Sequence, residues 1–308
     1  MLSRTAQNLY WMGRYIERAD ATARLVEMGR RMTMLPSANA EWRSVARASG
    51  CAGDLAENAN TSDRDIIVRL LLDPQNPSSI RCCVAQARAN AKAIRTALTS
   101  DMWEALNEHW RLLETLDSER AIEELPIWLD WTKQRAAAFR GAAETSLLRN
   151  DGYIFLKLGE LIERAEMTLR LLNVKYYVLL PETDVVGGGR DFHQWTSVLR
   201  ATSALRAYHH VNRGDYTPWG IAEFLVLNPH FPRSAAYCYG QLDRRLGELS
   251  ALYGGQRFEC HATAADMLAR LQASDIQTLF QSGLHEFIVE AIQVTNRLAN
   301  EITRAYHF

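Results

Sequence analysis

The sequence has few helix-breaking residues and no long apolar run. Among its 308 residues are only 8 prolines and 17 glycines, whereas alanine, leucine, glutamate and arginine, which favour helix, are abundant. No run of about 18 apolar residues is present, so we expect no transmembrane helix. No segment alternates for long between apolar and polar residues, and no Asn-Gly or Asp-Gly turn joins two such segments. The sequence therefore predicts an all-α fold.

Cysteine is also scarce, and its spacing is not that of a metal site. The five cysteines are Cys51, Cys82, Cys83, Cys238 and Cys260. No C-x-x-C or Cys-His spacing occurs, and the odd number and scattered positions are typical of reduced thiols in a cytoplasm. We therefore expect a cytoplasmic protein without a bound metal. Arg4 and Asn8 come before any apolar run, so we expect no signal peptide.

An excess of charge of one sign is missing as well. The 35 lysines and arginines balance 36 aspartates and glutamates, for a net charge of −1. No basic stripe stands out, so we expect no nucleic-acid partner. The sequence contains no P-loop, no G-x-S-x-G and no H-E-x-x-H, so it predicts no cofactor and offers no recognisable nucleophile.

One segment of the chain occurs twice. Leu9–Val26 and Phe155–Leu172 align at an offset of 146 residues, and 8 of the 14 positions from Gly13 and Gly159 onward are identical. Unrelated helices share leucines and alanines by chance, but rarely a G-x-x-I-E-R-A. The repeat indicates a duplicated helix.

The duplication divides the chain into related halves at about 1–149 and 150–308. No Gly/Ser-rich linker separates them, so we expect the halves to pack as one unit. The sequence predicts a single domain, 1–308, built as a bundle of about ten helices with an internal duplication.

Both copies of the helix carry charged residues on a face that also holds apolar residues. These charged residues are Arg14, Glu17 and Arg18 in the first copy, and Glu160, Glu163 and Arg164 in the second. Apolar neighbours such as Tyr10 and Leu25 suggest that the charges are at least partly buried, and buried charges must be paired. If the helices meet about a pseudo-twofold axis, the two sets can satisfy each other.

Three interpretations of these charges stay open. They form a structural ion-pair network that fixes helix register, they line a polar pocket that binds a carboxylate, an amine or a phosphate, or they are solvated and have no role.

Two turns bracketed by prolines place polar residues directly before a helix. The first is Asp73–Ile80, with Asn76, Ser78 and Ser79, and the second is Asn228–Ser234, with Arg233 and Ser234. Helix N-termini bind anions, which makes these five residues candidates for ligand binding. Capping of the following helix by serine is the simpler interpretation.

Some helix boundaries follow from caps and breakers. We expect the first helix to end near Met34, one helix from Phe192 to about Val211, and a last helix from about Ile276 to Tyr306. The last helix carries a long apolar stripe, so self-association into a homo-oligomer through this helix is one possibility.

Taken together, the motifs resemble those of the Alpha-E family, an all-helical bacterial family named for its helices and its E-R motif, and the resemblance extends over essentially the whole chain. The motifs that carry it are M-L-S-R, L-Y-W-M-G-R-Y-I-E-R-A-D, N-P-S-S-I, A-R-A-N-A, M-W-E-A-L-N, L-G-E-L-I-E-R-A-E-M-T and N-P-H-F-P-R-S. A-R-A-N-A adds Arg88 and Asn90 to the candidate binding residues. Glu160 departs from the arginine that the family often has there.

The resemblance implies a genomic setting rather than an activity. Members of the family tend to be encoded beside, or fused to, a circularly permuted ATP-grasp ligase, often near a transglutaminase-like and a proteasome-like peptidase. This implies a system that makes or modifies a peptide.

Two classes of function follow. In the first, the chain is a non-catalytic subunit that binds an ATP-grasp peptide ligase, its peptide substrate, or both. In the second, the chain is itself an enzyme acting on a peptide or aminoacyl substrate, with Glu17 or Glu163 as the acid/base group and Arg18, Arg164 and Arg88 orienting carboxylates or phosphates.

Overall fold

The protein is all-helical throughout the part that the structure describes. The computed structural model describes residues 3–34, 41–50, 58, 60–177 and 188–308, and none of these residues lies in a strand. They form fifteen α-helices and one 3₁₀ turn. The all-α prediction is confirmed, whereas the expected ten helices were too few because several expected helices are divided.

The first half of the chain contributes seven described helices before the second copy of the repeat. They are α1 (Ser3–Met32), α2 (Glu41–Ser49), α4 (Asp63–Leu71), α5 (Ile80–Ala93), α6 (Ser100–Thr115), α7 (Ser118–Glu123) and α8 (Leu125–Ser146), with a 3₁₀ turn at Arg95–Ala97.

The second half begins with the second copy of the repeat. Its helices are α9 (Asp151–Tyr177), α10 (Gly189–Ala201), α11 (Leu205–Asn212), α12 (Pro218–Val226), α13 (Ala235–Leu252), α14 (Glu259–Ala273), α15 (Ile276–Ser282) and α16 (Leu284–Ala305).

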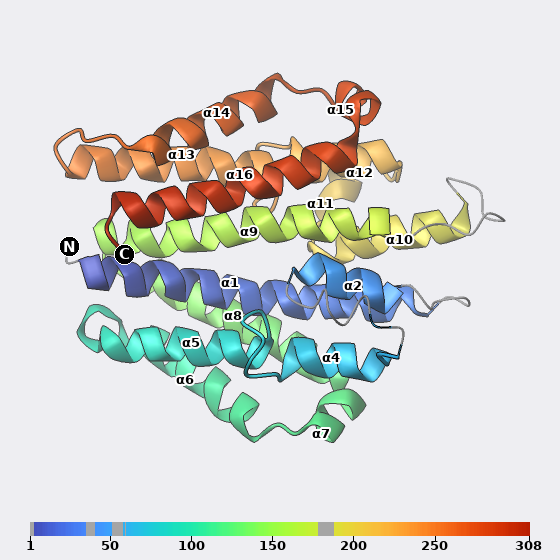
Figure 1. Cartoon of the computed structure of the whole chain (residues 1–308), viewed down its shortest axis with the longest axis horizontal. Helices are drawn as coiled ribbons and strands as arrows, with labels where there is room; N and C mark the ends of the chain where they lie inside the picture. The colour runs from blue at the N-terminus through green and yellow to red at the C-terminus, as the bar shows by residue number, and fades with distance from the viewer. Residues whose placement is uncertain (1–2, 35–40, 51–57, 59, 178–187) are drawn as a thin grey trace.

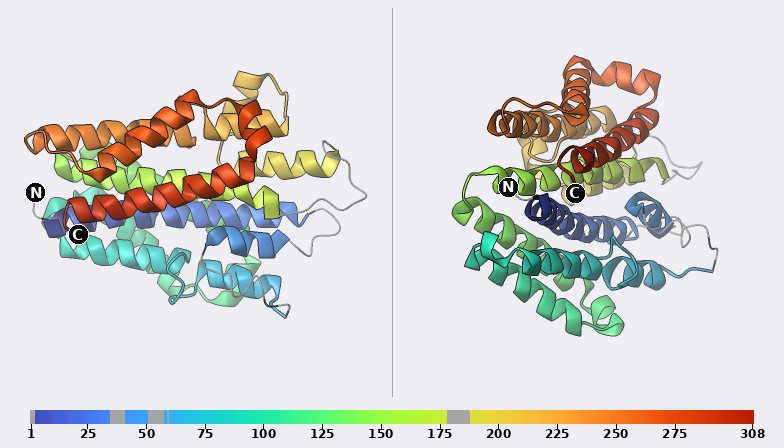
Figure 2. Two further views of the ribbon diagram at one scale, coloured as in Figure 1. Left: turned by 45° about the horizontal axis from the view of Figure 1, so that its top comes forward. Right: turned by 60° about the vertical axis from the view of Figure 1, so that its left-hand side comes forward.

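The two copies of the repeat, α1 and α9, lie side by side at the centre of the molecule (Figure 1). Helices α5 and α8 pack on α1, and α13 and α16 pack on α9. Figure 2 shows from two further directions that the early helices flank α1 on one side of this central pair and the late helices flank α9 on the other. Helices of its own half thus pack on each copy, and one helix of the other half also contacts it, α10 on α1 and α2 on α9.

Helix α1 is buried on nearly all sides because neighbours surround it. Leu9 and Ile16 are buried on one face, and Tyr10, Ala21 and Leu25 are buried on the opposite face. A helix that solvent cannot reach from either face carries its charged residues into the interior. The expectation that the charges of the repeat are buried is confirmed for this helix.

Single residues with positive φ divide two of the expected helices. The helix expected from 192 to 211 is interrupted between α10 and α11, where Ser203 has a φ of 56°. The helix expected from 276 to 306 is interrupted between α15 and α16, where Gly283 has a φ of 105°. A residue in this region of φ cannot continue a right-handed helix. Helix α1 ends at Met32, two residues before the expected boundary.

The apolar stripe of the last helix is used within the chain. Phe287, Ile288, Ala291 and Leu298 are buried, and α16 packs against α9 and α14. This stripe is therefore not a free surface for a second copy, and a homo-oligomer remains a prediction without this support. Among the described helices, none has the length and apolar character needed to cross a bilayer.

Candidate functional site

The two copies of the repeat touch backbone to backbone at equivalent glycines. A Cβ atom on Gly13 would lie 2.3 Å from the carbonyl oxygen of Leu156, and one on Gly159 would lie 2.0 Å from that of Tyr10. Tyr10 and Leu156 are themselves equivalent positions of the repeat. Both contacts therefore obey one approximate twofold relationship, and the absence of side chains at the glycines brings the helices close enough for the next turn to pair.

One turn further along, each E-R motif pairs with the other. The Arg18 guanidinium donates to both carboxylate oxygens of Glu163, at 2.5 and 2.8 Å. The Arg164 guanidinium donates to both oxygens of Glu17, at 3.0 and 2.9 Å. Two-point pairing of this kind is the strongest form of a side-chain ion pair. The expectation that the two sets of charges satisfy each other is confirmed for the E-R pairs, whereas Glu160 pairs within its own helix.

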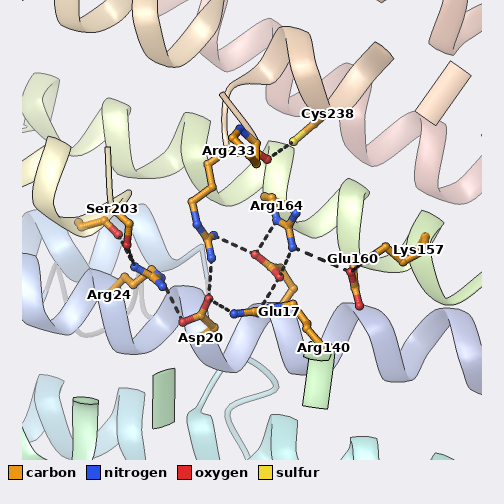
Figure 3. Close-up of polar contacts among 12 residues, drawn as sticks. Glu17, Asp20, Arg24, Arg140, Lys157, Glu160, Arg164, Ser203, Arg233 and Cys238 are labelled. Carbon is orange, nitrogen blue, oxygen red and sulfur yellow. Dashed lines mark hydrogen bonds and ion pairs between the residues drawn. The ribbon is translucent and has the colours of Figure 1, made fainter. Parts of the chain in front are cut away.

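Around Glu17 the pairing extends to helices of both halves (Figure 3). Glu17 also accepts from Arg140 of α8 and from Arg233 of the second proline-bracketed turn, each at 2.9 Å. Asp20, one turn later, accepts from Arg24, Arg140 and Arg233 at 3.0, 3.3 and 2.8 Å. We call Glu17, Asp20, Arg24, Arg140, Arg164 and Arg233 the Glu17 cluster.

Around Glu163 the pairing uses fewer elements. Glu163 accepts from Arg14 at 3.0 Å in addition to Arg18, and Arg170 donates to Glu166 at 2.9 Å. We call Arg14, Arg18, Glu163, Glu166 and Arg170 the Glu163 cluster. All of its members come from α1 and α9.

Glu160 stands where the first copy has Arg14, and this exchange makes the two clusters unequal. The buried Glu160 carboxylate accepts from Lys157 at 2.6 Å and lies 3.9 Å from Arg164. Its Oε1 atom has no hydrogen-bond partner among the described residues. An arginine at this position would repel Arg164, whereas the glutamate joins Lys157 to the edge of the Glu17 cluster.

The carboxylates at the centre are buried and ionised. Glu17 and Asp20 are 0% exposed, and Glu163 is 1% exposed. Burial alone would raise the pKa of Glu17, but the positive charges of Arg164, Arg140 and Arg233 hold that pKa well below its usual range. In the same way, burial alone would raise the pKa of Glu163, but the positive charges of Arg18 and Arg14 lower it. Both glutamates therefore act as fixed negative charges.

The proline-bracketed turns serve mainly to cap helices. Ser79 accepts from the backbone N–H of Cys82 at the start of α5, and Ser234 accepts from that of Tyr237 at the start of α13, each at 3.1 Å. Asn76 accepts from the N–H of Ser78 within the first turn. The capping interpretation is confirmed for both serines.

Thr22 of α1 donates to the carbonyl oxygen of Ser78, which ties the first turn to the central helix. Neither Asn76 nor Ser78 reaches the charged clusters through these contacts. Arg233 is the one candidate from the turns that joins the Glu17 cluster.

Arg88 and Asn90 lie apart from both clusters. Arg88 donates to Asn107 at 2.9 Å, and its guanidinium stacks 3.6 Å from the ring centre of Trp110 on α6. Asn90 lines a pocket beside the start of α1, and its Nδ2 atom is buried without a hydrogen-bond partner in the described structure. The structure therefore does not bring these two residues to the site that the E-R motifs form.

Sequence reasoning missed several members of the clusters. They are Asp20, Arg24, Arg140, Glu166 and Arg170. Four of them could have been predicted from the sequence. In both copies an acidic residue is followed four residues later by an arginine, a spacing at which helical side chains meet. Arg140 could not have been predicted, since its role depends on how α8 packs on α1.

An open polar pocket adjoins the Glu17 cluster and shares Arg164 with it. The pocket has a volume of about 650 Å³ and lies between α9, α13 and the end of α8. Its wall carries five cationic side chains and two carboxylates. Within the described residues, no group of histidine, cysteine, aspartate and glutamate has the arrangement of a metal site.

The paired E-R motifs and the all-helical fold agree with one protein family. Residues 1–307 match the model of Alpha-E, which is described as a predicted alpha-helical domain with a conserved ER motif. The chain belongs to the Alpha-E family. In this member, the motif occurs twice, and each copy satisfies the other.

Relatives of this Alpha-E chain include an uncharacterized protein of Mycobacterium bovis and one of Mycobacterium tuberculosis. Each is 23% identical to the chain over 315 residues, an alignment that covers 94% of this chain and 35% of the relative. The chain therefore spans about a third of the length of these relatives. No solved structure matches the chain significantly.

Proposed function

We propose that this Alpha-E chain is a binding subunit that docks on an ATP-grasp-type peptide ligase and helps to hold its peptide substrate. The observation that carries the proposal is the open, cation-rich pocket next to a charged centre whose carboxylates are already paired. The centre fixes the positions of the helices, and the pocket offers groups that can bind a ligand.

The buried carboxylates favour binding over acid/base catalysis. A general base must reach its substrate and have a pKa near the working pH. Glu17 and Glu163 are closed to solvent, each is held by more than one guanidinium, and both have lowered pKa values. The alternative, an enzyme that uses these glutamates on a peptide or aminoacyl substrate, therefore has the weaker physical support.

The partner in the proposal comes from the family. The resemblance implies a setting beside, or fused to, a circularly permuted ATP-grasp ligase. The mycobacterial relatives are almost three times as long as the part that aligns with this chain. A module that occurs within longer proteins fits a role that depends on other domains.

Co-purification tests the proposal. The chain is produced together with an ATP-grasp ligase of the kind that the family resemblance implies, and complex formation and peptide product are measured with and without the chain. We expect a stable complex and a change in the rate or identity of the product. A ligase that shows full activity, an unchanged product and no association would remove the proposal.

The same assay separates the two classes of function. Glu17→Gln and Glu163→Gln are compared with the parent chain for folding, ligase binding and product formation. If either variant folds and binds the ligase but stops product formation, the result favours the enzyme alternative over the binding subunit.

A further inference from the structure

The pocket beside the Glu17 cluster has a counterpart in the other half of the chain. A second pocket, of about 600 Å³, lies between the start of α1 and the end of α5. We call it the N-terminal pocket, and we call the pocket between α9 and α13 the C-terminal pocket.

The two pockets are lined by equivalent positions of the duplication. Gln7, Asn8, Trp11 and Tyr15 of the N-terminal pocket are 146 residues before Tyr153, Ile154, Lys157 and Leu161 of the C-terminal pocket. On the flanking helices, Asn90 and Ala93 correspond to Arg245 and Glu248 when the capping residues Ser79 and Ser234 are aligned. Duplication therefore produced one pocket in each half.

The chemistry of the two pockets has diverged. The N-terminal pocket contains one charged residue, Arg4. In the C-terminal pocket, Lys157 takes the position of Trp11, and Arg245 takes that of Asn90. Three further arginines and two glutamates complete the charged lining, and the buried Glu160 and Glu17 behind it pair with Lys157 and Arg164. An excess of positive charge is left. Such an excess in a concave site attracts anions.

An aromatic ring holds the arginines of the C-terminal pocket in place. The guanidinium groups of Arg149 and Arg245 lie 3.9 and 5.2 Å from the ring centre of Tyr153. A guanidinium stacked on a ring is held in one plane, and its N–H edge, which in this chain pairs with Glu144 or Glu248, matches the two oxygens of a carboxylate. The pocket thus presents preorganised carboxylate-binding groups on an otherwise solvated wall.

The glutamates of the C-terminal pocket are themselves bound to its walls. Glu144 accepts from Arg149 at 2.7 Å and from the Tyr153 hydroxyl at 3.0 Å. Burial opposes the shift, but the charge of Lys157 and these hydrogen bonds lower the pKa of Glu144 to about 2. Glu248 lies 2.8 Å from Arg245. These two glutamates neutralise part of the cationic lining, and the remaining charge of the lining is positive.

We infer that the C-terminal pocket binds an acidic peptide, through at least two carboxylates of that peptide, and that the N-terminal pocket does not. This inference rests on the proposed function and names the substrate class that the subunit would hold. A volume of about 650 Å³ is too large for a single phosphate, and cations come from the connection after α8, from α9 and from α13 rather than from one helix N-terminus. Ile154 and Leu161 add apolar wall for the methylene groups of acidic side chains.

Calorimetric titration of the full chain with three probes tests the inference. The probes are triglutamate, the neutral analogue triglutamine, and pyrophosphate. We expect triglutamate to bind, more weakly as salt is raised, triglutamine not to bind, and pyrophosphate to bind more weakly than triglutamate. Absence of triglutamate binding, equal binding of triglutamine, or tighter binding of pyrophosphate would each overturn the inference.

A double variant locates the binding. Arg149→Gln with Arg244→Gln removes two cations whose side chains are 51% and 55% exposed, so the fold should be unaffected. The matched control is Arg120→Gln with Arg297→Gln, two equally exposed arginines of i,i+4 ion pairs outside both pockets. We expect the pocket variant to lose about tenfold or more in triglutamate affinity and the control to lose less than about twofold. Equal losses in both variants would place the binding elsewhere.

The outcome is separable from that of the proposed function. If the chain forms a complex with the ligase but does not bind triglutamate, the acidic-peptide inference fails and the subunit role stands. If the chain binds triglutamate but does not associate with the ligase, the acidic-peptide inference stands and the docking role fails.

Discussion

Gly13 and Gly159 face each other's helices across the approximate twofold relationship of the duplication. Each would place a Cβ atom within 2.5 Å of a backbone oxygen of the other copy. No side chain fits at that separation. The glycine that opens each G-x-x-I-E-R-A motif therefore sets the distance at which the following glutamate and arginine can meet.

Substitution at this contact should destabilise the protein. Because the new methyl group would meet backbone rather than a movable side chain, we expect Gly159→Ala to lower the free energy of unfolding by about 2–4 kcal/mol. Urea denaturation followed by circular dichroism measures the loss. Gly141→Ala on α8 is the control, since a Cβ there meets nothing within 4 Å. The control should be stabilised by up to about 1 kcal/mol. Equal stability of the two variants would contradict the close contact.

Removing one of the central charges should cost far more than removing a surface charge. Glu17→Gln removes the buried carboxylate that pairs with Arg164, Arg140 and Arg233, and Asp20 alone cannot balance these arginines. We therefore expect a loss of about 3–5 kcal/mol in the free energy of unfolding. The comparison is Glu290→Gln, whose side chain is 52% exposed and pairs with Arg270. An exposed pair contributes less than about 1 kcal/mol. A loss at Glu17 no larger than that at Glu290 would show that the centre is not buried.

The buried carboxylates should make the protein sensitive to acid. The pKa values of Glu17, Asp20 and Glu163 are lowered in the folded state, because arginines outweigh the effect of burial. In the unfolded chain, such groups titrate near pH 4. The unfolded chain therefore takes up protons first, and the stability that these groups contribute is present above about pH 5 and is lost as the pH falls toward the folded pKa values.

Unfolding free energies measured from pH 7 to pH 3 check this dependence. We expect a decline below about pH 5 in the parent chain and a shallower decline in Glu17→Gln, which lacks one of the titrating groups. Parallel curves for the two proteins would mean that Glu17 is not held ionised.

His109 should begin to lower stability at a higher pH than the buried carboxylates do. Its ring is buried against Trp131, and burial, with repulsion from Arg135, lowers the pKa of His109 to about 3. An unfolded histidine titrates near pH 6.5, so the unfolded chain binds one more proton between about pH 6.5 and 3. Stability is therefore expected to fall by up to about 1.4 kcal/mol per pH unit below pH 6.5.

Nuclear magnetic resonance identifies the contribution of His109 directly. We expect its ring signals to stay unchanged from pH 8 to pH 5, and we expect His109→Phe to remove the decline in stability between pH 6.5 and 5.5. A ring that titrates near pH 6.5 in the folded protein would contradict the burial.

The repeat in the sequence predicted the centre of the fold well. The charge pattern of Arg14, Glu17 and Arg18 against Glu160, Glu163 and Arg164 indicated both burial and mutual pairing, because buried charges must find partners. What could not be read was the contribution of elements outside the repeat. Arg140 joins the Glu17 cluster only because α8 packs on α1, and such packing is not encoded in a local pattern.

Helix interruptions were less predictable because they depend on one residue each. Ser203 adopts a positive φ where its hydroxyl accepts from Arg24 at 2.6 Å, so a contact made in the folded state supports the break.

The paired pockets were not predicted from the sequence for another reason. Helices α5 and α13 align at an offset of 155 residues (Ser79 to Ser234) rather than 146, and the similarity between them is too weak to recognise without the fold.

A double-mutant cycle between Arg18 and Glu163 tests most directly that the two copies of the repeat hold each other. Arg18→Met, Glu163→Gln and the combined variant are compared with the parent chain by urea denaturation. Because Glu163 is buried and accepts two hydrogen bonds from Arg18, we expect a coupling energy of about 2 kcal/mol or more. Losses that add to within about 0.5 kcal/mol would show that the two residues act independently, and the reciprocal E-R pairing would then be wrong.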